Sequence, residues 1–115
     1  MSHVAGVRGE DRAAAWLAGE GWSILARNVR SRWGEIDIVA ARGKDLAFVE
    51  VKSWNALGKE SLEQSVGPRK QWRIRRTAEW YLAGRRDLGA LRPRFDVLFV
   101  KGGAVSAADH IEGAF

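Results

Sequence analysis

The spacing of apolar residues along the chain alternates between a helical period and a strand period, and these changes mark out its elements. Helical spacing predicts helices at 6–20 and from Pro68 to about Leu82. A period of two predicts strands at 22–30, 34–41, 45–52 and 94–101, and the end of the chain allows one further short edge strand. The order helix, three strands, helix, strand indicates a single mixed α/β domain spanning 1–115.

The hairpin predicted at 34–52 has charged residues inside its strands, where a small domain is expected to place its core. Because side chains alternate along a strand, Glu50 and Lys52 share one face of the second strand, and Glu35 and Asp37 share one face of the first. Both faces of these strands are also rich in apolar residues. We therefore expect a central strand that is covered on both sides.

The register of this hairpin follows from its turn. A polar turn at 42–45 places Ala41 opposite Leu46, and counting back along both strands places Asp37 opposite Glu50. Directly paired β-carbons lie about 4.5 to 5.5 Å apart, so two carboxylates there repel each other unless positive charge lies between them. The pattern favours a divalent cation at this point.

Both predicted helices carry charge on faces that should pack against the sheet. Glu10 stands at the head of an otherwise apolar stripe of the first helix, and Lys70 lies among apolar positions of the second. The amine of Lys70 is therefore within reach of a shared site. A neighbouring stripe of the second helix is suited to phosphate contacts and contains Arg69, Arg73 and Arg76.

Composition narrows the classes of function. The chain has no cysteine, and its two histidines, expected at the terminal surface, are His3 and His110, so a metal would need oxygen ligands. The net charge of +5 favours a polyanionic partner such as nucleic acid or an anionic membrane surface. The sequence lacks a membrane-spanning apolar run and a signal-peptide pattern, so we expect a cytoplasmic protein with no membrane partner.

An acid from the first helix, an aspartate on one strand and Glu-x-Lys on its partner resemble the catalytic constellation of the restriction-endonuclease-like nucleases, which include Holliday junction resolvases. Over nearly its full length the chain is similar to the YraN-like family of predicted nucleases. The motifs that carry this resemblance are "GEDRAAAWLAGEGWSILARNVR", "GEIDIVA", "FVEVK", "PRK", "WYLAG", "RFDV" and "HIEGAF". The resemblance implies a mixed β-sheet flanked by helices, and a homodimer that is worth testing. Its active-site positions correspond to Glu10, Asp37, Glu50 and Lys52.

This resemblance implies hydrolysis of phosphodiester bonds with Mg²⁺ or Mn²⁺ as cofactor. Asp37 and Glu50 would hold the metal, with the Val51 carbonyl as a further ligand and Glu10 completing the shell through a water or a second metal. Lys52 would orient or deprotonate the attacking water and stabilise the transition state. We expect Glu35 to lie beside the metal ligands rather than on the metal.

The basic residues around this site predict binding to a nucleic-acid backbone, with DNA favoured over RNA. Phosphate contacts position a substrate without reading its sequence, so little base specificity is expected. The aromatic residues suited to stacking on bases are Trp33, Trp54 and Trp72. The predicted nucleic-acid-binding residues are Arg30, Arg32, Trp33, Arg69, Lys70, Arg73 and Arg76.

Three classes of function are compatible with these patterns. The first is a metal-dependent endonuclease that acts on DNA, including branched or junction DNA. The second is a nucleic-acid-binding protein that keeps the nuclease fold without efficient cleavage, and the third is an interaction module whose carboxylates are structural. Outside the site, Asp96 is expected to be the structural partner of an arginine.

Overall fold

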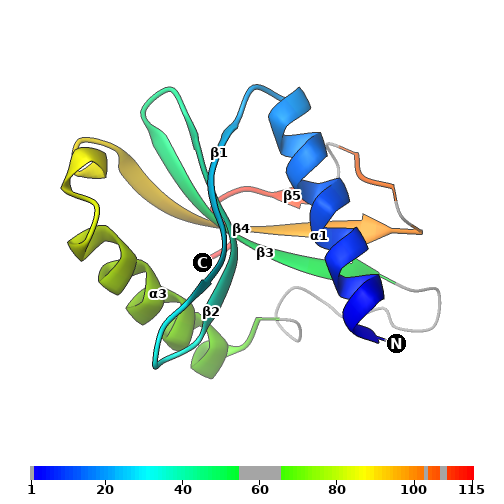
Figure 1. Ribbon diagram of the computed structural model, residues 1–115, viewed down its shortest axis with the longest axis horizontal. Coiled ribbons are helices and arrows are strands. Elements are labelled where there is room, and N and C mark those ends of the chain that lie inside the picture. Colours follow the sequence, from blue (N-terminus) through cyan, green and yellow to red (C-terminus); the bar gives the residue numbers. More distant parts are fainter. Residues whose placement is uncertain (1, 55–65, 103, 107–108) are drawn as a thin grey trace.

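The predicted order of elements is present in the structure, a computed structural model that describes residues 2–54, 66–102, 104–106 and 109–115 (Figure 1). A short terminal strand follows the predicted elements. No helix in these described ranges is long and apolar enough to cross a membrane. The elements are α1 (Ser2–Gly19), β1 (Ser23–Arg30), β2 (Glu35–Arg42), β3 (Asp45–Trp54), α3 (Pro68–Ala83), the 3-10 helix η1 (Arg86–Leu88), β4 (Arg92–Lys101) and β5 (His110–Ile111).

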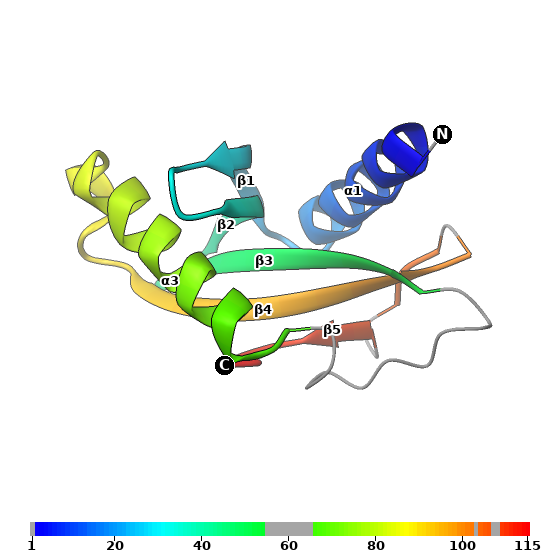
Figure 2. The same ribbon diagram turned by 90° about the horizontal axis from the view of Figure 1, so that it is seen from below.

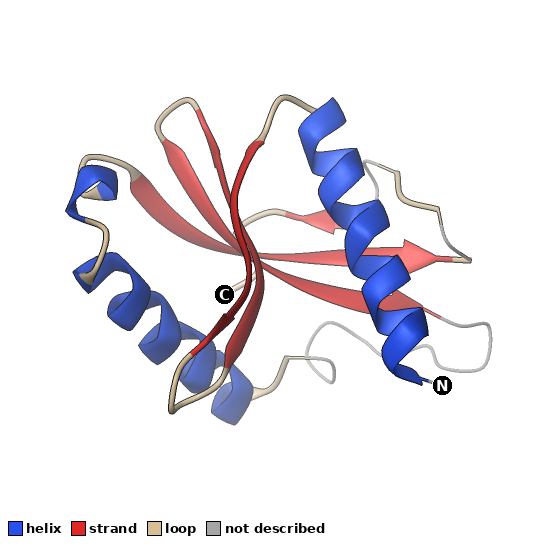
Figure 3. Ribbon diagram, in the orientation of Figure 1, coloured by secondary structure: helices blue, strands red, loops and turns tan. Residues whose placement is uncertain are grey.

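The strands of the described chain form one mixed sheet with the order β1-β2-β3-β4-β5 (Figure 3). Neighbouring strands are antiparallel at β1/β2, β2/β3 and β4/β5, whereas β3 and β4 are parallel. Parallel neighbours need a crossover connection, and α3 lies in the connection between β3 and β4. The crossover brings the basic helix back to the sheet.

The β2–β3 hairpin has the predicted register. Ala41 pairs with Leu46, and the pairing continues back to Ile38 and Val49. The turn contains Gly43 with φ of 61°, a left-handed conformation that glycine adopts without steric cost. The two strands are thus aligned as the alternation of the sequence requires.

Helices α1 and α3 lie on opposite sides of the β1–β2 hairpin, as both views show (Figures 1 and 2). Leu17 of α1 packs in one buried cluster with Val49, and Ile74 of α3 packs in another with Phe48. Consecutive residues of β3 therefore belong to different cores. This confirms the prediction that β3 is covered on both faces.

The C-terminal segment is anchored to the sheet by Asp96, which is fully buried on β4. Its carboxylate accepts hydrogen bonds from Arg94 Nη2 at 3.0 Å and from the Gly113 backbone N–H at 3.0 Å, and it lies 2.7 Å from His110 Nε2. The arginine partner is the predicted one. The expectation that His110 lies at the surface is wrong: its side chain is 6% exposed and meets Trp16 edge to face.

A polar side chain is rarely buried without partners, and the Asp96 carboxylate supplies one for the ring of His110. The sequence pattern around His110 did not indicate this contact, because Asp96 lies on another strand, β4. The side chain of His3 is outside the described part of the chain.

Replacing Asp96 with asparagine is expected to lower the free energy of unfolding by about 1.5 to 3 kcal/mol, the usual contribution of hydrogen bonds to a charged group. Burial alone would raise the pKa of Asp96, but the hydrogen bond from His110 and the charge of Arg94 lower it below its ordinary value. Chemical denaturation measures the effect. Asp87→Asn, at an exposed carboxylate of η1, should leave the stability nearly unchanged. An equal change in both variants would contradict the anchoring role of Asp96.

Candidate active site

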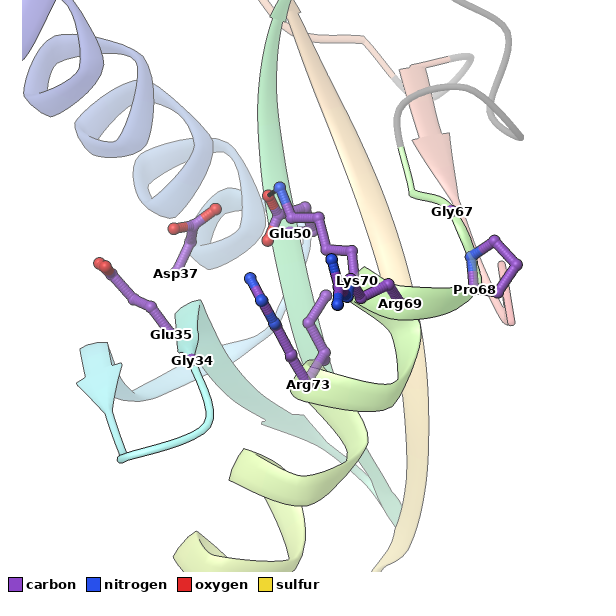
Figure 4. Close-up of a pocket in the computed structure, with 10 residues that line it drawn as sticks. Gly34, Glu35, Asp37, Glu50, Gly67, Pro68, Arg69, Lys70 and Arg73 are labelled. Atoms are coloured by element: carbon purple, nitrogen blue, oxygen red, sulfur yellow. Dashed lines mark ion pairs between the residues drawn. The ribbon is translucent and has the colours of Figure 1, made fainter.

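A pocket of about 660 Å³ lies where the start of β2, the middle of β3 and the first turns of α3 meet (Figure 4). The two strands contribute carboxylates and the helix contributes basic side chains. The hollow brings together three residues of the predicted site, which are Asp37, Glu50 and Lys70. The lining residues are Gly34, Glu35, Asp37, Glu50, Gly67, Pro68, Arg69, Lys70, Arg73 and Ile74.

Asp37 and Glu50 both line this pocket, as the predicted register requires. The recorded pairing of β2 with β3 ends at Ile38 and Val49, one step before these two carboxylates. Beyond this point a side chain links the two strands: Asp37 Oδ2 accepts a hydrogen bond from the Val51 backbone N–H at 2.8 Å. The carboxylate is therefore held by the backbone of the neighbouring strand.

The position of Asp37 raises its pKa from 3.8 to about 7. Burial of the carboxyl group is the largest cause, and the negative charge of Glu50 is the second. The hydrogen bond from Val51 acts in the opposite direction but does not cancel these effects. Near neutral pH, Asp37 thus exchanges between its protonated and charged forms.

Two lysines neutralise Glu50, whose side chain is 8% exposed. The Nζ of Lys70 lies 2.7 Å from Glu50 Oε1, and the Nζ of Lys52 lies 3.7 Å from the same oxygen. Burial would lower the pKa of Lys70, but its hydrogen bond to Glu50 raises it, so the amine stays charged. Lys70 reaches the site from α3, as the helical spacing indicates (Figure 4).

Glu10 and Glu35 stand at the margin of the carboxylate pair. Glu10 is outside the lining of the pocket and its Oε1 lies 3.6 Å from Arg27 Nε, while burial raises its pKa. Glu35 lines the pocket and forms an ion pair of 3.5 Å with Arg30. Both charges still raise the pKa of Asp37. Within the described ranges, no three Asp, Glu, His or Cys side chains are grouped so that they could hold a metal ion.

Apart from Arg30, which forms an ion pair with Glu35, the predicted nucleic-acid-binding residues separate into two groups. Arg69, Lys70 and Arg73 line the pocket itself. Arg32 and Arg76 instead place their guanidinium carbons 4.9 and 4.7 Å from the ring of Trp33. The first group faces the carboxylates and the second forms a separate surface with aromatic rings.

The contact that holds the β1–β2 turn against α3 was not predicted. Ser31, in the β1–β2 turn, shares a hydroxyl hydrogen bond of 2.8 Å with Thr77 of α3. A β-carbon on Gly34 would come within 3.3 Å of the Arg73 side chain, so glycine allows the turn to lie against the helix. A glycine directly before a strand was the signal for this close approach.

The model of Uncharacterised protein family UPF0102 matches residues 9–100 of the chain. The chain belongs to this family. A UPF0102 protein from Syntrophotalea carbinolica is 46% identical over 108 residues, covering 93% of this chain and 87% of the relative. One from Moorella thermoacetica is 44% identical over 110 residues, covering 93% and 91%, and one from Persephonella marina is 38% identical over 115 residues, covering 100% and 96%.

The UPF0102 match takes in α1 from Gly9 onward, the β2–β3 hairpin, α3 and most of β4. It therefore contains both carboxylates of the pocket and the lysines that contact Glu50. The names of the UPF0102 relatives state no reaction, so the activity has to be argued from the site.

Proposed function

We propose that this UPF0102 protein is a metal-dependent endonuclease that hydrolyses phosphodiester bonds in DNA and acts in the cytoplasm. The observation that carries the proposal is that Asp37 and Glu50 line one pocket to which α3 contributes basic side chains, those of Arg69, Lys70 and Arg73. Two adjacent carboxylates attract a divalent cation, and the basic residues attract the phosphates of a substrate. The proposed DNA substrates include branched and junction DNA.

The side chains present suit Mg²⁺ or Mn²⁺. Both ions prefer oxygen ligands, and Mg²⁺ is commonly held by one or two carboxylates together with substrate phosphate and water. Burial is the first and the charge of Glu50 the second cause that raises the pKa of Asp37, and a bound cation would favour its charged form. In this proposal Asp37, Glu50 and the Val51 carbonyl hold the metal, and Glu10 acts from the margin through a water.

The metal, when bound, would lower the pKa of a coordinated water and polarise the phosphoryl group. Lys52, beside Glu50, would orient the attacking water and stabilise the charge that develops on the phosphoryl oxygens. The attacking water gives up a proton to solvent as its oxygen bonds to phosphorus, the bond from phosphorus to the leaving sugar oxygen breaks, and that oxygen takes up a proton from solvent. When the substrate binds, Lys70 would exchange its contact with Glu50 for one with the substrate phosphate.

Arg69 and Arg73 would hold the flanking backbone phosphates from the first turns of α3. Contacts to phosphate carry no sequence information, which supports the expectation of little base specificity.

A second candidate is a nucleic-acid-binding protein that keeps this fold without efficient cleavage. The ion pair of 2.7 Å between Lys70 and Glu50 favours it, because an amine already compensates this carboxylate. Such a protein would bind nucleic acid in a salt-dependent way and would release no product with any divalent cation.

The first test is cleavage of labelled single-stranded, duplex, flap and four-way DNA in the presence of Mg²⁺ or Mn²⁺. We expect products that appear with either ion and disappear with a chelator, because the carboxylate pair needs the cation to act on phosphate. The same substrates made of RNA measure the preference for DNA.

Binding without product for every substrate and both ions would contradict the endonuclease and support the second candidate. Cleavage that continues in the chelator would contradict the metal dependence. Sedimentation of the same preparation tests for the homodimer.

A further inference from the structure

One exposed tryptophan on α3 and one half-buried tryptophan in the β1–β2 turn lie near Arg76. Trp72 is 54% exposed, and Trp33 is half-buried beside it in the turn. The guanidinium of Arg76 contacts both, at 4.7 Å from the ring of Trp33 and 5.8 Å from that of Trp72. We call Trp33, Trp72 and Arg76 the aromatic strip.

We propose that the aromatic strip stacks on unpaired bases, so that the substrate of the neighbouring pocket carries a single-stranded segment beside the bond that is cut. The proposal rests on the proposed function for the identity of the ligand as nucleic acid. It adds the class of substrate, which the carboxylates and lysines do not determine.

The strip lies directly beside the pocket. Gly34, which follows Trp33 in the chain, lines the pocket, and so do Arg69 and Arg73, within one helical turn of Trp72. A strand whose phosphates contact these arginines therefore passes the tryptophan rings. The bases of that strand are the groups that would meet them.

The turn that carries Trp33 is fixed before any ligand binds. The Trp33 backbone N–H donates to Ser31 Oγ at 3.1 Å, and Ser31 Oγ is within 2.8 Å of Thr77 Oγ1, a residue with no exposed surface. The Ser31 backbone N–H also donates to the Gly34 carbonyl at 2.8 Å. A rigid platform loses little conformational entropy on binding, which favours stacking.

The charge around the strip favours nucleic acid over a protein partner. Helix α3 contains five basic residues within its first nine positions, and its acid, Glu79, already forms an ion pair of 3.4 Å with Arg76. Aromatic rings combined with basic side chains are typical of single-strand binding, because every base offers a flat face and every nucleotide a phosphate. In a duplex these faces are covered by neighbouring base pairs, so paired DNA cannot use the rings.

The test is fluorescence anisotropy with a labelled single-stranded oligonucleotide and a blunt duplex of the same sequence, in a chelator so that nothing is cut. Trp72→Ala and Trp33→Ala should each weaken single-strand binding about tenfold or more and leave duplex binding within about threefold. Trp72→Phe should retain most of the affinity because its ring still stacks.

Trp80 provides the matched control. It is 50% exposed on the same helix but lies about 12 Å farther along the axis from Trp72, beside Tyr81 and Arg85. Trp80→Ala should bind the single strand within about twofold of the wild type. Circular dichroism of each variant verifies that the fold is unchanged.

Equal weakening for duplex and single strand, or unchanged binding in both alanine variants, would overturn the proposal. So would a change of oligomeric state in Trp72→Ala, since the ring would then belong to a contact between copies. The two proposals fail separately. If binding depends on the aromatic strip but no metal supports cleavage, only the endonuclease proposal is contradicted. If the strip variants cleave blunt duplex at the full rate, only the proposed substrate class is contradicted.

Discussion

Replacing Glu50 with glutamine is expected to slow metal-dependent cleavage by at least about 100-fold while the protein stays folded. Glutamine has the same shape but no charge, so the pocket loses one of its two anionic ligands. The counter-ion of two lysines is lost as well, but the side chains of Lys52 and Lys70 are 26% and 41% exposed, so water can solvate their amines. The fold should therefore tolerate the change better than the chemistry does.

Cleavage rate and calorimetric titration with Mn²⁺ are the measurements, and the second does not depend on turnover. The matched control is Asp87→Asn, which neutralises a carboxylate of η1 that pairs with Arg85 and lies outside the pocket. Asp87→Asn should cut and bind Mn²⁺ as the wild type does. A Glu50→Gln variant that cleaves at the wild-type rate would show that the reaction takes place elsewhere.

Replacing Asp37 with asparagine is expected to make the protein more stable at about pH 8 and to abolish its stabilisation by Mg²⁺. The folded-state pKa of Asp37 is about 7, above the ordinary value of 3.8. The folded protein therefore holds a proton that the unfolded chain has released. The resulting stabilisation is complete below pH 3.8 and is lost as the pH rises to about 7.

Asparagine does not ionise, and its amide oxygen can still accept the hydrogen bond from Val51. The two proteins should have similar melting temperatures near about pH 4. At about pH 8 the variant should gain up to about 4 kcal/mol, since the pKa difference is about three units and each unit is equivalent to about 1.4 kcal/mol. Mg²⁺ should raise the melting temperature of the wild type alone, because it binds the charged pair.

Thermal melts across this pH range, with and without Mg²⁺, measure both effects. Asp11→Asn serves as the control, since Asp11 is 55% exposed and pairs with Arg27. A wild-type protein that loses no stability relative to Asp37→Asn between about pH 4 and about pH 8 would contradict the raised pKa of Asp37.

The sequence predicted the elements and the hairpin register because each has a strong local signal. Side chains of a strand alternate with a period of two, so a slip of one residue would move the apolar set of β3 to the wrong faces. The turn at 42–45 then determined that Ala41 lies opposite Leu46, as observed. From that register alone, Asp37 and Glu50 could be assigned to one side of the sheet.

Contacts between elements distant in the chain were harder to predict. Helical spacing placed Glu10 on the inner face of α1 but could not indicate that Arg27 of β1 lies 3.6 Å from it. His110 lies in a strand of two residues, which is too short to show an alternation of apolar and polar residues. The partner of its buried side chain, Asp96, lies on another strand. These contacts depend on how helices and strands are placed on the sheet, which spacing within one element does not determine.

The hydrogen bond from Val51 to Asp37 bears on how the pocket would bind a cation. A surface aspartate must stop rotating before it can coordinate, and that ordering subtracts from affinity. Asp37 has already been ordered by the backbone of β3 during folding. A cation would therefore bind a carboxylate whose orientation is already fixed. We expect the direction of the bond from Asp37 to the metal to be determined by the sheet and not by rearrangement on binding.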